Sequence, residues 1–492
     1  MGVIRPLISL RTGTVVLAAW LSGCAALEVH NAPVNRPLTG NAAAALAMGR
    51  DNTSGSDDLM VGLAFSGGGT RAAAFSFGVL TEIERTRVPG RAGSSSLLDR
   101  VNFISGVSGG SVLTAYYGLK KRAALEDFRE RFLLRNAEES LSTHVSPLSV
   151  VRAVAGGVND TGKLARWLDA NLFEGATFSD MRRTRGPGVW INAADIYNRT
   201  TFVFGSAAFA ALCSDLASYP IADAVAASAA VPVVFAPAVI KAYPQSCTDK
   251  PPEWIKRAQR NPNTVPMLKA FADALARYHS GSMNYVKLLD GGLVDNFGLS
   301  GFTIARLLSD TPYGPLTKQE AVKLRRAIII IVDAGRGPSG EWTQTVEGPG
   351  GTELMMAAAD TAIDASVRAS FTAFKSVMEE WQGALIRWRC ALPADERAKL
   401  GVPADWNCRD LRFYINRVGF DQLGPERAKA LNAVATRFAL PPEQVDALIA
   451  AGGDALRESA LFREFLGGLG RPPAPRLLPT ARVADTVLAA TP

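Results

Sequence analysis

Residues 101–110 read VNFISGVSGG, an apolar run that ends in a glycine-rich turn, and this stretch decides the fold. Its first five residues predict a short buried strand, and residues 111–119 predict a helix directly after the turn. Ser108 stands at the centre of the turn between Gly106 and Gly110, which completes the pattern GxSxG. Small flanking residues permit the sharp bend that exposes a serine at the carboxyl end of a strand. The N–H groups of the following helix favour negative charge at the same spot, so Ser108 is a candidate nucleophile.

The same pattern occurs one unit earlier in the chain. Residues 59–65 predict a buried strand and residues 72–84 predict a helix, with a run of three glycines between them. Two successive units of strand, glycine-rich turn and helix predict an α/β fold with a mostly parallel sheet. Further strands are expected at residues 189–194, 202–204, 286–289, 326–333 and 411–415.

The glycine run Gly67-Gly68-Gly69 has two interpretations. Glycine-rich loops ahead of helices can hold phosphate, but this one lacks the Gly-Lys-Ser/Thr of a nucleotide P-loop and does not fit GxGxxG. The alternative is an oxyanion hole, in which consecutive amides stabilise the oxygen that becomes negative during acyl transfer.

A nucleophilic serine needs a base, and the sequence offers only three histidines. His30 lies in an expected tether, and His144 and His279 lie at neither a glycine-bounded turn nor a clear strand end. Asp290 is the better candidate, because it ends a predicted strand and is followed by two glycines. Its carboxylate could accept the serine proton at that edge. In isolation, an Asp-Gly-Gly sequence would be read as a turn at a strand end.

Three ordered pieces of the chain resemble the patatin-like phospholipase family. They are residues 67–71 (GGGTR), residues 106–110 (GVSGG) and residues 290–292 (DGG). A fourth piece, residues 226–237, resembles the segment ahead of the family's aspartate. The resemblance covers residues 59–335.

The resemblance implies a patatin-like three-layer sandwich around a mostly parallel sheet, and a serine–aspartate dyad that uses no histidine. Ser108 would be the nucleophile and Asp290 its base. No metal or other cofactor is expected. The resemblance also implies an oxyanion hole at Gly67, Gly68 and Gly69, with Arg71 near it. Gly291 and Gly292, which follow the aspartate, belong to the same family pattern. Two positions depart from the family pattern: Ala72 where many members have Gly, and Gly298 where many have Pro.

The first residues resemble a bacterial lipoprotein signal. Two arginines precede a short apolar stretch, and Leu21-Ser22-Gly23-Cys24 follows it. The apolar stretch is far shorter than the roughly 20 residues of a membrane-spanning helix. We therefore expect residues 1–23 to be removed and Cys24 to be lipidated, which holds the chain at the bacterial envelope. By resemblance to Gram-negative lipoproteins, Ala25 rather than Asp after the cysteine favours the outer membrane. The alternative is an ordinary secretory signal that contains a cysteine.

The chain is expected to divide into residues 1–23 (signal peptide), 24–58 (lipidated cysteine and tether), 59–335 (catalytic domain) and 336–492 (a mainly helical C-terminal region packing on the core). C-terminal helices are expected from a cap at Thr352 to about Trp381, over residues 425–437, and over residues 442–451 up to Gly452-Gly453. Residues 244–263 predict an insertion loop. The helical stretches 125–134 and 164–172 form either an apolar lip over the site or plain core.

Composition narrows the class of partner. The net charge of +7 is small for 492 residues, and no block of Lys and Arg stands out, so nucleic acid is not indicated. Beyond Cys24 the chain has four cysteines, an even number that suits disulfides in an exported protein. Cys213–Cys247 and Cys390–Cys408 are local pairs, but three connectivities stay open. The absence of a CxxC pattern argues against structural zinc.

These observations predict a membrane-anchored serine acyl-ester hydrolase of the phospholipase A or lysophospholipase type, acting on phospholipid or another acyl-ester lipid. Three alternatives stay open. A lipid acyltransferase would use the same dyad with a second alcohol in place of water. An α/β-hydrolase triad would require His144 or His279. A non-catalytic envelope lipoprotein would bind partners through the C-terminal third.

Overall fold

The computed structural model describes residues 29–39, 58–90, 93–139, 141, 156–183, 186–247, 250–337, 341–402 and 406–469. The expected signal peptide, Cys24, most of the expected tether and the tail from Arg471 lie outside these residues. Within the described part of the chain, no helix has both the length and the hydropathy needed to cross a membrane.

The centre of the molecule is an eight-stranded sheet with the order β10-β9-β1-β4-β5-β8-β7, and β6 pairs with β5. The pairings from β10 to β5 are parallel, whereas β5–β6, β5–β8 and β8–β7 are antiparallel. The prediction of a mostly parallel sheet is confirmed. The strands are β1 (Leu59–Phe65), β4 (Val101–Val107), β5 (Gly188–Asp195), β6 (Thr200–Val203), β7 (Ala238–Lys241), β8 (Tyr285–Asp290), β9 (Arg326–Asp333) and β10 (Arg412–Gly419).

Both faces of the sheet are covered, and β1 shows how the sequence achieves this. Val61, Leu63 and Phe65 belong to one hydrophobic core, while Met60 and Ala64 belong to a second core on the opposite face. Side chains alternate between the two faces of a strand, so a fully apolar strand suits the middle of a three-layer fold.

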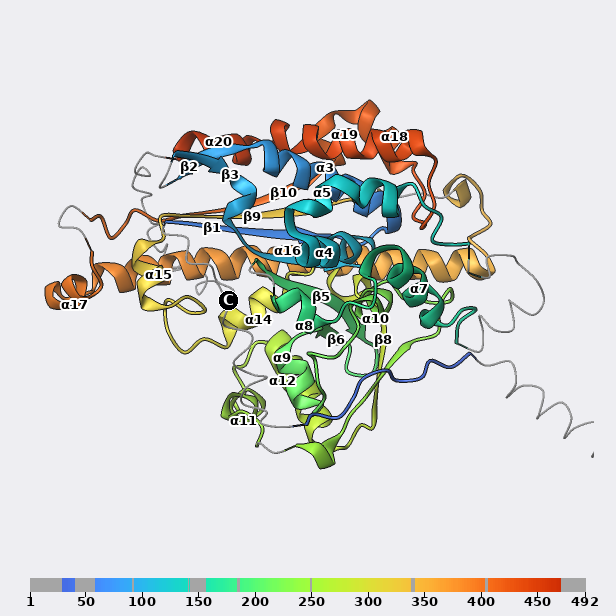
Figure 1. Ribbon diagram of the computed structural model, residues 1–492, viewed down its shortest axis with the longest axis horizontal. Helices are drawn as coiled ribbons and strands as arrows, with labels where there is room; N and C mark the ends of the chain where they lie inside the picture. Colours follow the sequence, from blue (N-terminus) through green and yellow to red (C-terminus); the bar gives the residue numbers. More distant parts are fainter. Residues whose placement is uncertain are drawn as a thin grey trace, which may run out of the picture.

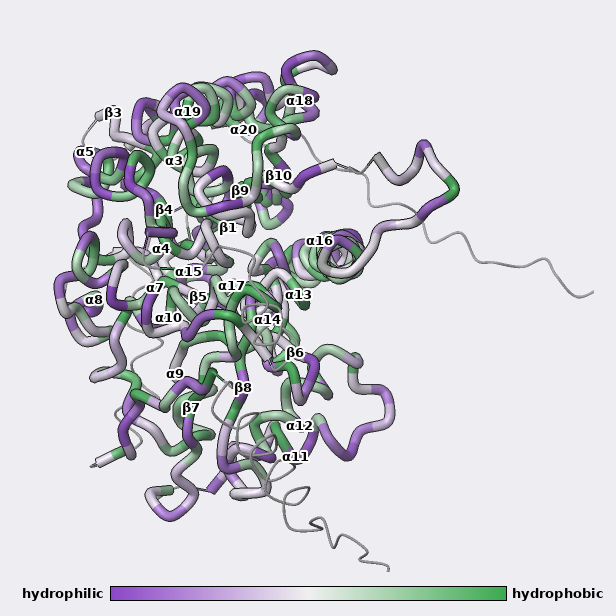
Figure 2. Tube along the Cα trace, turned by 90° about the vertical axis from the view of Figure 1, so that its right-hand side faces the viewer, coloured by the Kyte–Doolittle hydropathy of each residue, from purple (hydrophilic) through white to green (hydrophobic). Residues whose placement is uncertain are grey.

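Helices form the two outer layers. In Figure 1, α19 and α20 lie above β1, β9 and β10, and α16 runs below them. In Figure 2, the same strands have α3 and α19 on one side and α16 on the other. The helices nearest the site are α3 (Gly69–Arg85), α4 (Gly109–Lys120), α10 (Ile221–Ser228), α13 (Gly292–Asp295), α14 (Ser300–Leu307), α16 (Gly351–Cys390) and α19 (Pro442–Glu458).

The remaining elements surround this centre. A hairpin is formed by β2 (Arg87–Gly90) and β3 (Gly93–Ser96). The other helices are α5 (Ala124–Phe128), α7 (Thr161–Leu168), α8 (Phe178–Arg183), α9 (Ser206–Ala211), α11 (Glu253–Arg260), α12 (Pro266–Ser280), α15 (Lys318–Lys323), α17 (Ala394–Lys399), α18 (Pro425–Asn432) and α20 (Ala460–Gly468).

The helix α19 passes through the glycine pair that was expected to end it. A Cβ added to Gly452 would lie 2.1 Å from the carbonyl oxygen of Phe75 on α3. On α3, a Cβ added to Gly78 would lie 2.0 Å from the carbonyl oxygen of Ile449. These glycines therefore allow two helix backbones to touch, and Gly452 does not stop the helix.

Other boundaries also differ from the sequence prediction. The helix α16 begins at Gly351 and continues beyond Trp381 to Cys390, whereas α18 ends at Asn432. The expected insertion loop at residues 244–263 contains the helix α11. Of the stretches considered as a lip, Phe128, Phe132, Leu164, Leu168 and Leu172 are buried in the main core, so their inward faces are core.

The C-terminal region is more than a helical extension, because β10 pairs with β9 over eight residues, from Arg412 to Gly419. Two disulfides are present, Cys213–Cys247 and Cys390–Cys408, with Cα–Cα distances of 5.1 and 5.0 Å. The second joins the end of α16 to the segment that leads into β10. Both local pairings that the sequence left open are therefore the ones formed.

Candidate active site

The sheet register brings Ser108 and Asp290 together. On β4, Val107 pairs with Asn192 of β5, so Ser108 stands level with Ala193, the next residue on β5. On the other side of β5, Asp290 pairs with Ala193. The two side chains therefore reach towards each other across the end of one strand. Because β8 is antiparallel to β5, the strand that ends in Asp290 runs opposite to β4 and β5. The sequence pattern of a strand does not reveal its direction in the sheet.

Ser108 occupies the sharp turn expected of a nucleophile. Its φ and ψ are 51° and −124°, an unusual conformation for a residue with a side chain, and α4 begins at the next residue. The neighbouring glycines are needed for space, not only for flexibility. A Cβ on Gly109 would lie 2.0 Å from the carbonyl oxygen of Gly69, and one on Gly110 would lie 2.5 Å from that of Phe65. A Cβ on Gly106 would lie 2.4 Å from the hydroxyl oxygen of Thr114.

Asp290 is a buried carboxylate with an altered acidity. Its side chain is 7% exposed, and burial raises its pKa to about 6. The backbone N–H of Gly292, 2.9 Å from Oδ1, and the Ser108 hydroxyl both hydrogen-bond the carboxylate and oppose the rise. A base with a pKa close to the working pH is well matched to taking a proton from a hydroxyl.

The glycine run lies beside the nucleophile, but its amides are not equivalent. The N–H of Gly67 donates to the side-chain oxygen of Asn296 at 3.1 Å and to its carbonyl at 3.2 Å. Gly68 and Gly69 have φ values of 136° and 59° and open the N-terminus of α3. Their amides find no acceptor within the described part of the chain. Of the three amides expected to form an oxyanion hole, that of Gly67 is therefore already hydrogen-bonded, and those of Gly68 and Gly69 remain candidates.

Arg71 ties the glycine run to the rest of the molecule. Its Nε donates to the carbonyl of Ala334 at 3.0 Å and its Nη1 donates to the carbonyl of Val434 at 2.8 Å. The side chain is 2% exposed, and burial lowers its pKa to about 10. Arg71 follows the glycine run directly, and its hydrogen bonds hold backbone segments together.

A C-terminal segment, residues 434–438, crosses the start of α3, and we call it the strap. The carbonyl of Arg437 accepts the N–H of Thr70 at 2.9 Å, and a Cβ on Gly69 would lie 2.6 Å from that carbonyl oxygen. On its far side the strap bonds to Glu138, which accepts the N–H of Phe438 at 2.6 Å. The C-terminal region thus contributes directly to the position of the glycine run.

Ser228 connects the two halves of the dyad and was not singled out by the sequence. It is fully buried at the end of α10. Its hydroxyl accepts the N–H of Ser108 at 2.9 Å and donates to the carbonyl of Asn192 at 2.6 Å. Its own carbonyl accepts the N–H of Gly291 at 3.2 Å. The only signal in the sequence was its place in residues 226–237, the segment ahead of the aspartate.

Behind the dyad, a buried polar chain joins β4, β5 and the turn after α13. The amide nitrogen of Asn192 donates to the Ser105 hydroxyl at 2.8 Å, which donates to the carbonyl of Gly298 at 2.7 Å. Gly298 has φ 67°, and proline, whose ring holds φ near −65°, cannot adopt it. A proline at this position would therefore require another backbone conformation.

The glycines after the aspartate are required by close backbone packing. A Cβ on Gly291 would lie 2.5 Å from the carbonyl oxygen of Asn192. One on Gly292 would lie 2.9 Å from the side-chain oxygen of Asn296. Gly292 also supplies the N–H that meets Asp290, so this turn shapes the base as well as the backbone.

The two histidines in the described part of the chain, His30 and His279, take no part in this arrangement. The Nδ1 of His279 lies 3.6 and 3.9 Å from the sulfurs of Cys247 and Cys213, which are joined in a disulfide. His144 lies outside the described residues, and His30 lies at the exposed surface. The carboxylate that meets Ser108 is Asp290, as the dyad interpretation requires.

The sequence matches the family model of the patatin-like phospholipases over residues 63–303. No curated protein matches it. Among solved structures, human GIVD cytosolic phospholipase A2 is 12% identical with a TM-score of 0.36, covering 83% of this chain and 62% of that chain. VipD from Legionella pneumophila is 13% identical with a TM-score of 0.30, covering 83% of this chain and 67% of that chain. The chain thus spans less than two thirds of the human enzyme's length.

Proposed function

The chain carries a patatin-like phospholipase domain over residues 63–303, and from this premise we propose that it is a lipid acyl hydrolase that cleaves acyl esters with a Ser108–Asp290 dyad. The observation that carries the proposal is the pairing of a strained serine with a buried carboxylate whose pKa is about 6. Such a carboxylate is ionised at neutral pH and can accept the serine proton without a histidine.

In the first step, the Ser108 hydroxyl oxygen attacks the ester carbonyl while its proton passes to Asp290. The carbonyl oxygen becomes negative and is held by the free amides of Gly68 and Gly69 at the N-terminus of α3. The bond to the leaving alcohol then breaks, and that alcohol takes the proton from Asp290. The product is an acyl-enzyme on Ser108.

In the second step, a water molecule gives its proton to Asp290 and attacks the acyl-enzyme. The same two amides hold the oxyanion, and the fatty acid leaves as Ser108 recovers its proton. The strap holds the start of α3 directly after the glycine loop, since Thr70 donates to the carbonyl of Arg437 and Arg71 donates to that of Val434. Removing one oxyanion donor from such a site costs about 10²–10³ in rate.

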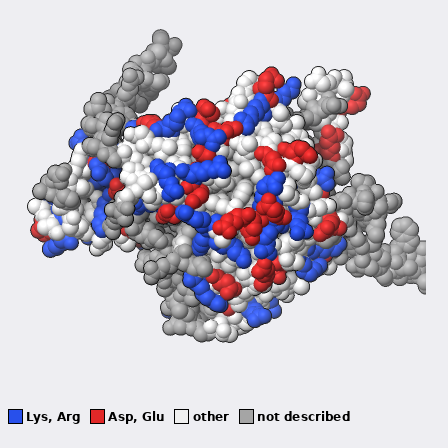
Figure 3. All heavy atoms as spheres, turned by 45° about the horizontal axis from the view of Figure 1, so that its top comes forward, with Lys and Arg blue, Asp and Glu red and all other residues white. Residues whose placement is uncertain are grey.

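The proposed substrate is a phospholipid or another acyl-ester lipid at a membrane. Lipidation of Cys24 would hold the enzyme at the bacterial envelope, with the outer membrane favoured by Ala25. Figure 3 shows Lys and Arg interspersed with Asp and Glu over the face that carries the upper helices. This face therefore has no continuous stretch of positive charge of the kind that binds nucleic acid.

The test is hydrolysis of a series of short- and long-chain esters, together with labelling by a fluorophosphonate. We expect Ser108→Ala and Asp290→Asn to be inactive and His279→Ala to keep wild-type activity. The label should be found on Ser108. Loss of activity in His279→Ala, or an active Asp290→Asn, would exclude the dyad. Metabolic labelling with palmitate, compared between wild type and Cys24→Ser, tests the anchor separately.

A further inference from the structure

A cavity of about 310 Å³ lies near the beginning of β5, apart from the dyad. Its wall includes Gly188, Val189 and Trp190, the first three residues of that strand. Trp190 pairs with Ser105, which precedes the nucleophile by three residues on the neighbouring strand. Neither dyad residue and none of the oxyanion glycines lines the cavity. It is therefore a separate site from the one that performs the chemistry.

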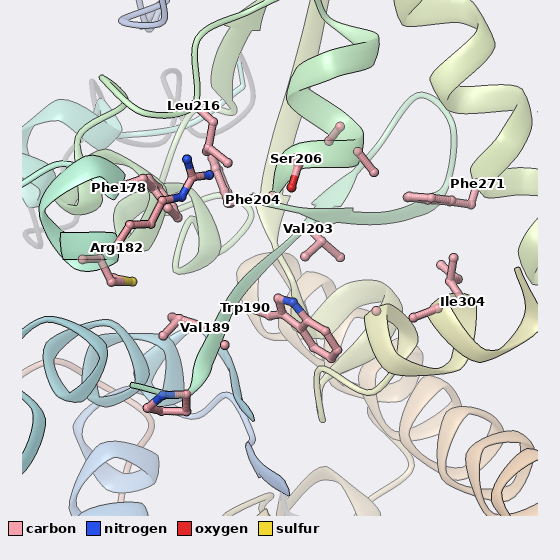
Figure 4. A pocket seen from close by; sticks show the side chains of 18 of the residues that line it. Phe178, Arg182, Val189, Trp190, Val203, Phe204, Ser206, Leu216, Phe271 and Ile304 are labelled. Carbon is pink, nitrogen blue, oxygen red and sulfur yellow. The ribbon is translucent and has the colours of Figure 1, made fainter. Parts of the chain in front are cut away.

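The walls of the cavity are mainly hydrocarbon. Large apolar side chains come from α8, β5, β6, α12 and α14, and Figure 4 shows them arranged around a common space. Protein interiors leave few voids larger than a water molecule, and a dry apolar cavity of about 150 Å³ already binds benzene. A space of twice that size suits a longer hydrocarbon chain. The apolar members include Phe178, Trp190, Val203, Phe204, Phe271 and Ile304.

Two polar side chains lie among apolar ones on one side of the cavity. Among the described residues that line it, Arg182 is the only charged one, and Ser206 adds a hydroxyl. Figure 4 places Arg182 and Ser206 on one side, with Val189 and Trp190 on the other. The guanidinium is partly buried, and this burial lowers its pKa, while Asp215 nearby opposes the shift. A cation at the border of an apolar space complements an amphiphile that carries one negative charge.

We propose that this cavity binds a free long-chain fatty acid, with its hydrocarbon chain among the aromatic side chains and its carboxylate against Arg182. The choice of ligand rests on the proposed function, because the hydrolase releases this molecule. The cavity thus gives the enzyme a second lipid site, through which its own product can accumulate on the protein away from Ser108.

The test uses the Ser108→Ala protein, which cannot form an acyl-enzyme. Fluorescent cis-parinaric acid reports binding, and oleate displaces it. We expect Arg182→Gln to weaken oleate binding about tenfold while leaving methyl oleate binding unchanged, because only the charged contact is lost. The matched control is Arg183→Gln, since Arg183 is mostly exposed, pairs with Asp180 and does not line the cavity. Ala305→Trp fills the cavity from α14 and should abolish binding of both lipids.

Three results would overturn the proposal: no fatty-acid binding, binding that survives Ala305→Trp, or equal oleate affinity in Arg182→Gln and its parent. Folding of each variant is checked by its thermal midpoint. Hydrolysis is measured separately on wild type. If wild type cleaves no ester while binding still depends on Arg182, the proposed function fails and the fatty-acid site stands.

Discussion

In the proposed mechanism, the protonation of Asp290 controls whether Ser108 can act. Burial raises the pKa of this carboxyl to about 6, and the base must be ionised to accept the serine proton. We therefore expect kcat/KM for a soluble ester to fall as pH drops through about 6 and to level off above it. A pH–rate profile with a neutral ester substrate measures this. A profile that stays flat down to pH 4 would contradict the assignment of Asp290 as the base.

The same carboxyl should weaken the folded state at neutral pH. Its folded pKa of about 6 exceeds the value of about 3.9 in an unfolded chain, so unfolding becomes easier as pH rises between the two. Asp290→Asn removes the buried charge. We expect it to raise the unfolding free energy by up to about 2–3 kcal/mol above pH 6, with the gain vanishing below about pH 4. Thermal midpoints of both proteins at pH 4 and pH 8 check the sign, and a lower midpoint for the variant at pH 8 would refute it.

Ser228 acts through its neighbours and is a positioning residue. Ser228→Ala leaves the N–H of Ser108 without its acceptor and the carbonyl of Asn192 without its donor. We expect kcat to fall about tenfold or more with KM nearly unchanged, because the nucleophile loses its alignment. Ser76→Ala is the control, since Ser76 is also fully buried and its hydroxyl has no partner in the described part of the chain. Equal kcat losses in the two variants would mean that Ser228 only supports the fold.

At the scale of elements, the contact between α3 and α19 distinguishes two adjacent glycines. A Cβ on Gly452 would meet the backbone of Phe75 at 2.1 Å, whereas the contacts of one on Gly453 begin at 3.4 Å. We expect Gly452→Ala to lower the thermal midpoint, because the helices must separate. Gly453→Ala should raise it slightly, since alanine is favoured over glycine inside a helix by up to about 1 kcal/mol. Equal shifts in the same direction would show that α19 does not pack on α3 in this way.

At the scale of the molecule, the C-terminal region and the catalytic core should unfold together. The strand β10 extends the sheet beside β9, and the strap holds the first residues of α3. We expect loss of esterase activity and loss of far-UV circular dichroism to follow one thermal transition, which Gly452→Ala shifts as a whole. Activity that persists after part of the helical signal is lost would indicate two independent units.

The sequence alone identified what is encoded within short segments. Apolar runs predicted β1, β4 and β9, and the glycine-bounded turn predicted the bend at Ser108, because side-chain periodicity and backbone sterics act over a few residues. Tertiary structure decided how distant groups meet. The amide of Gly67 bonds to Asn296, 229 residues away, so only Gly68 and Gly69 keep amides that could serve the oxyanion hole we propose. The hydrogen bond from Ser108 to Ser228, the contact of the strap with α3 and the position of Asp290 on an antiparallel strand likewise arise only when distant segments become neighbours. Hydrogen-bond partners are chosen when the chain packs, and no local pattern carries that choice.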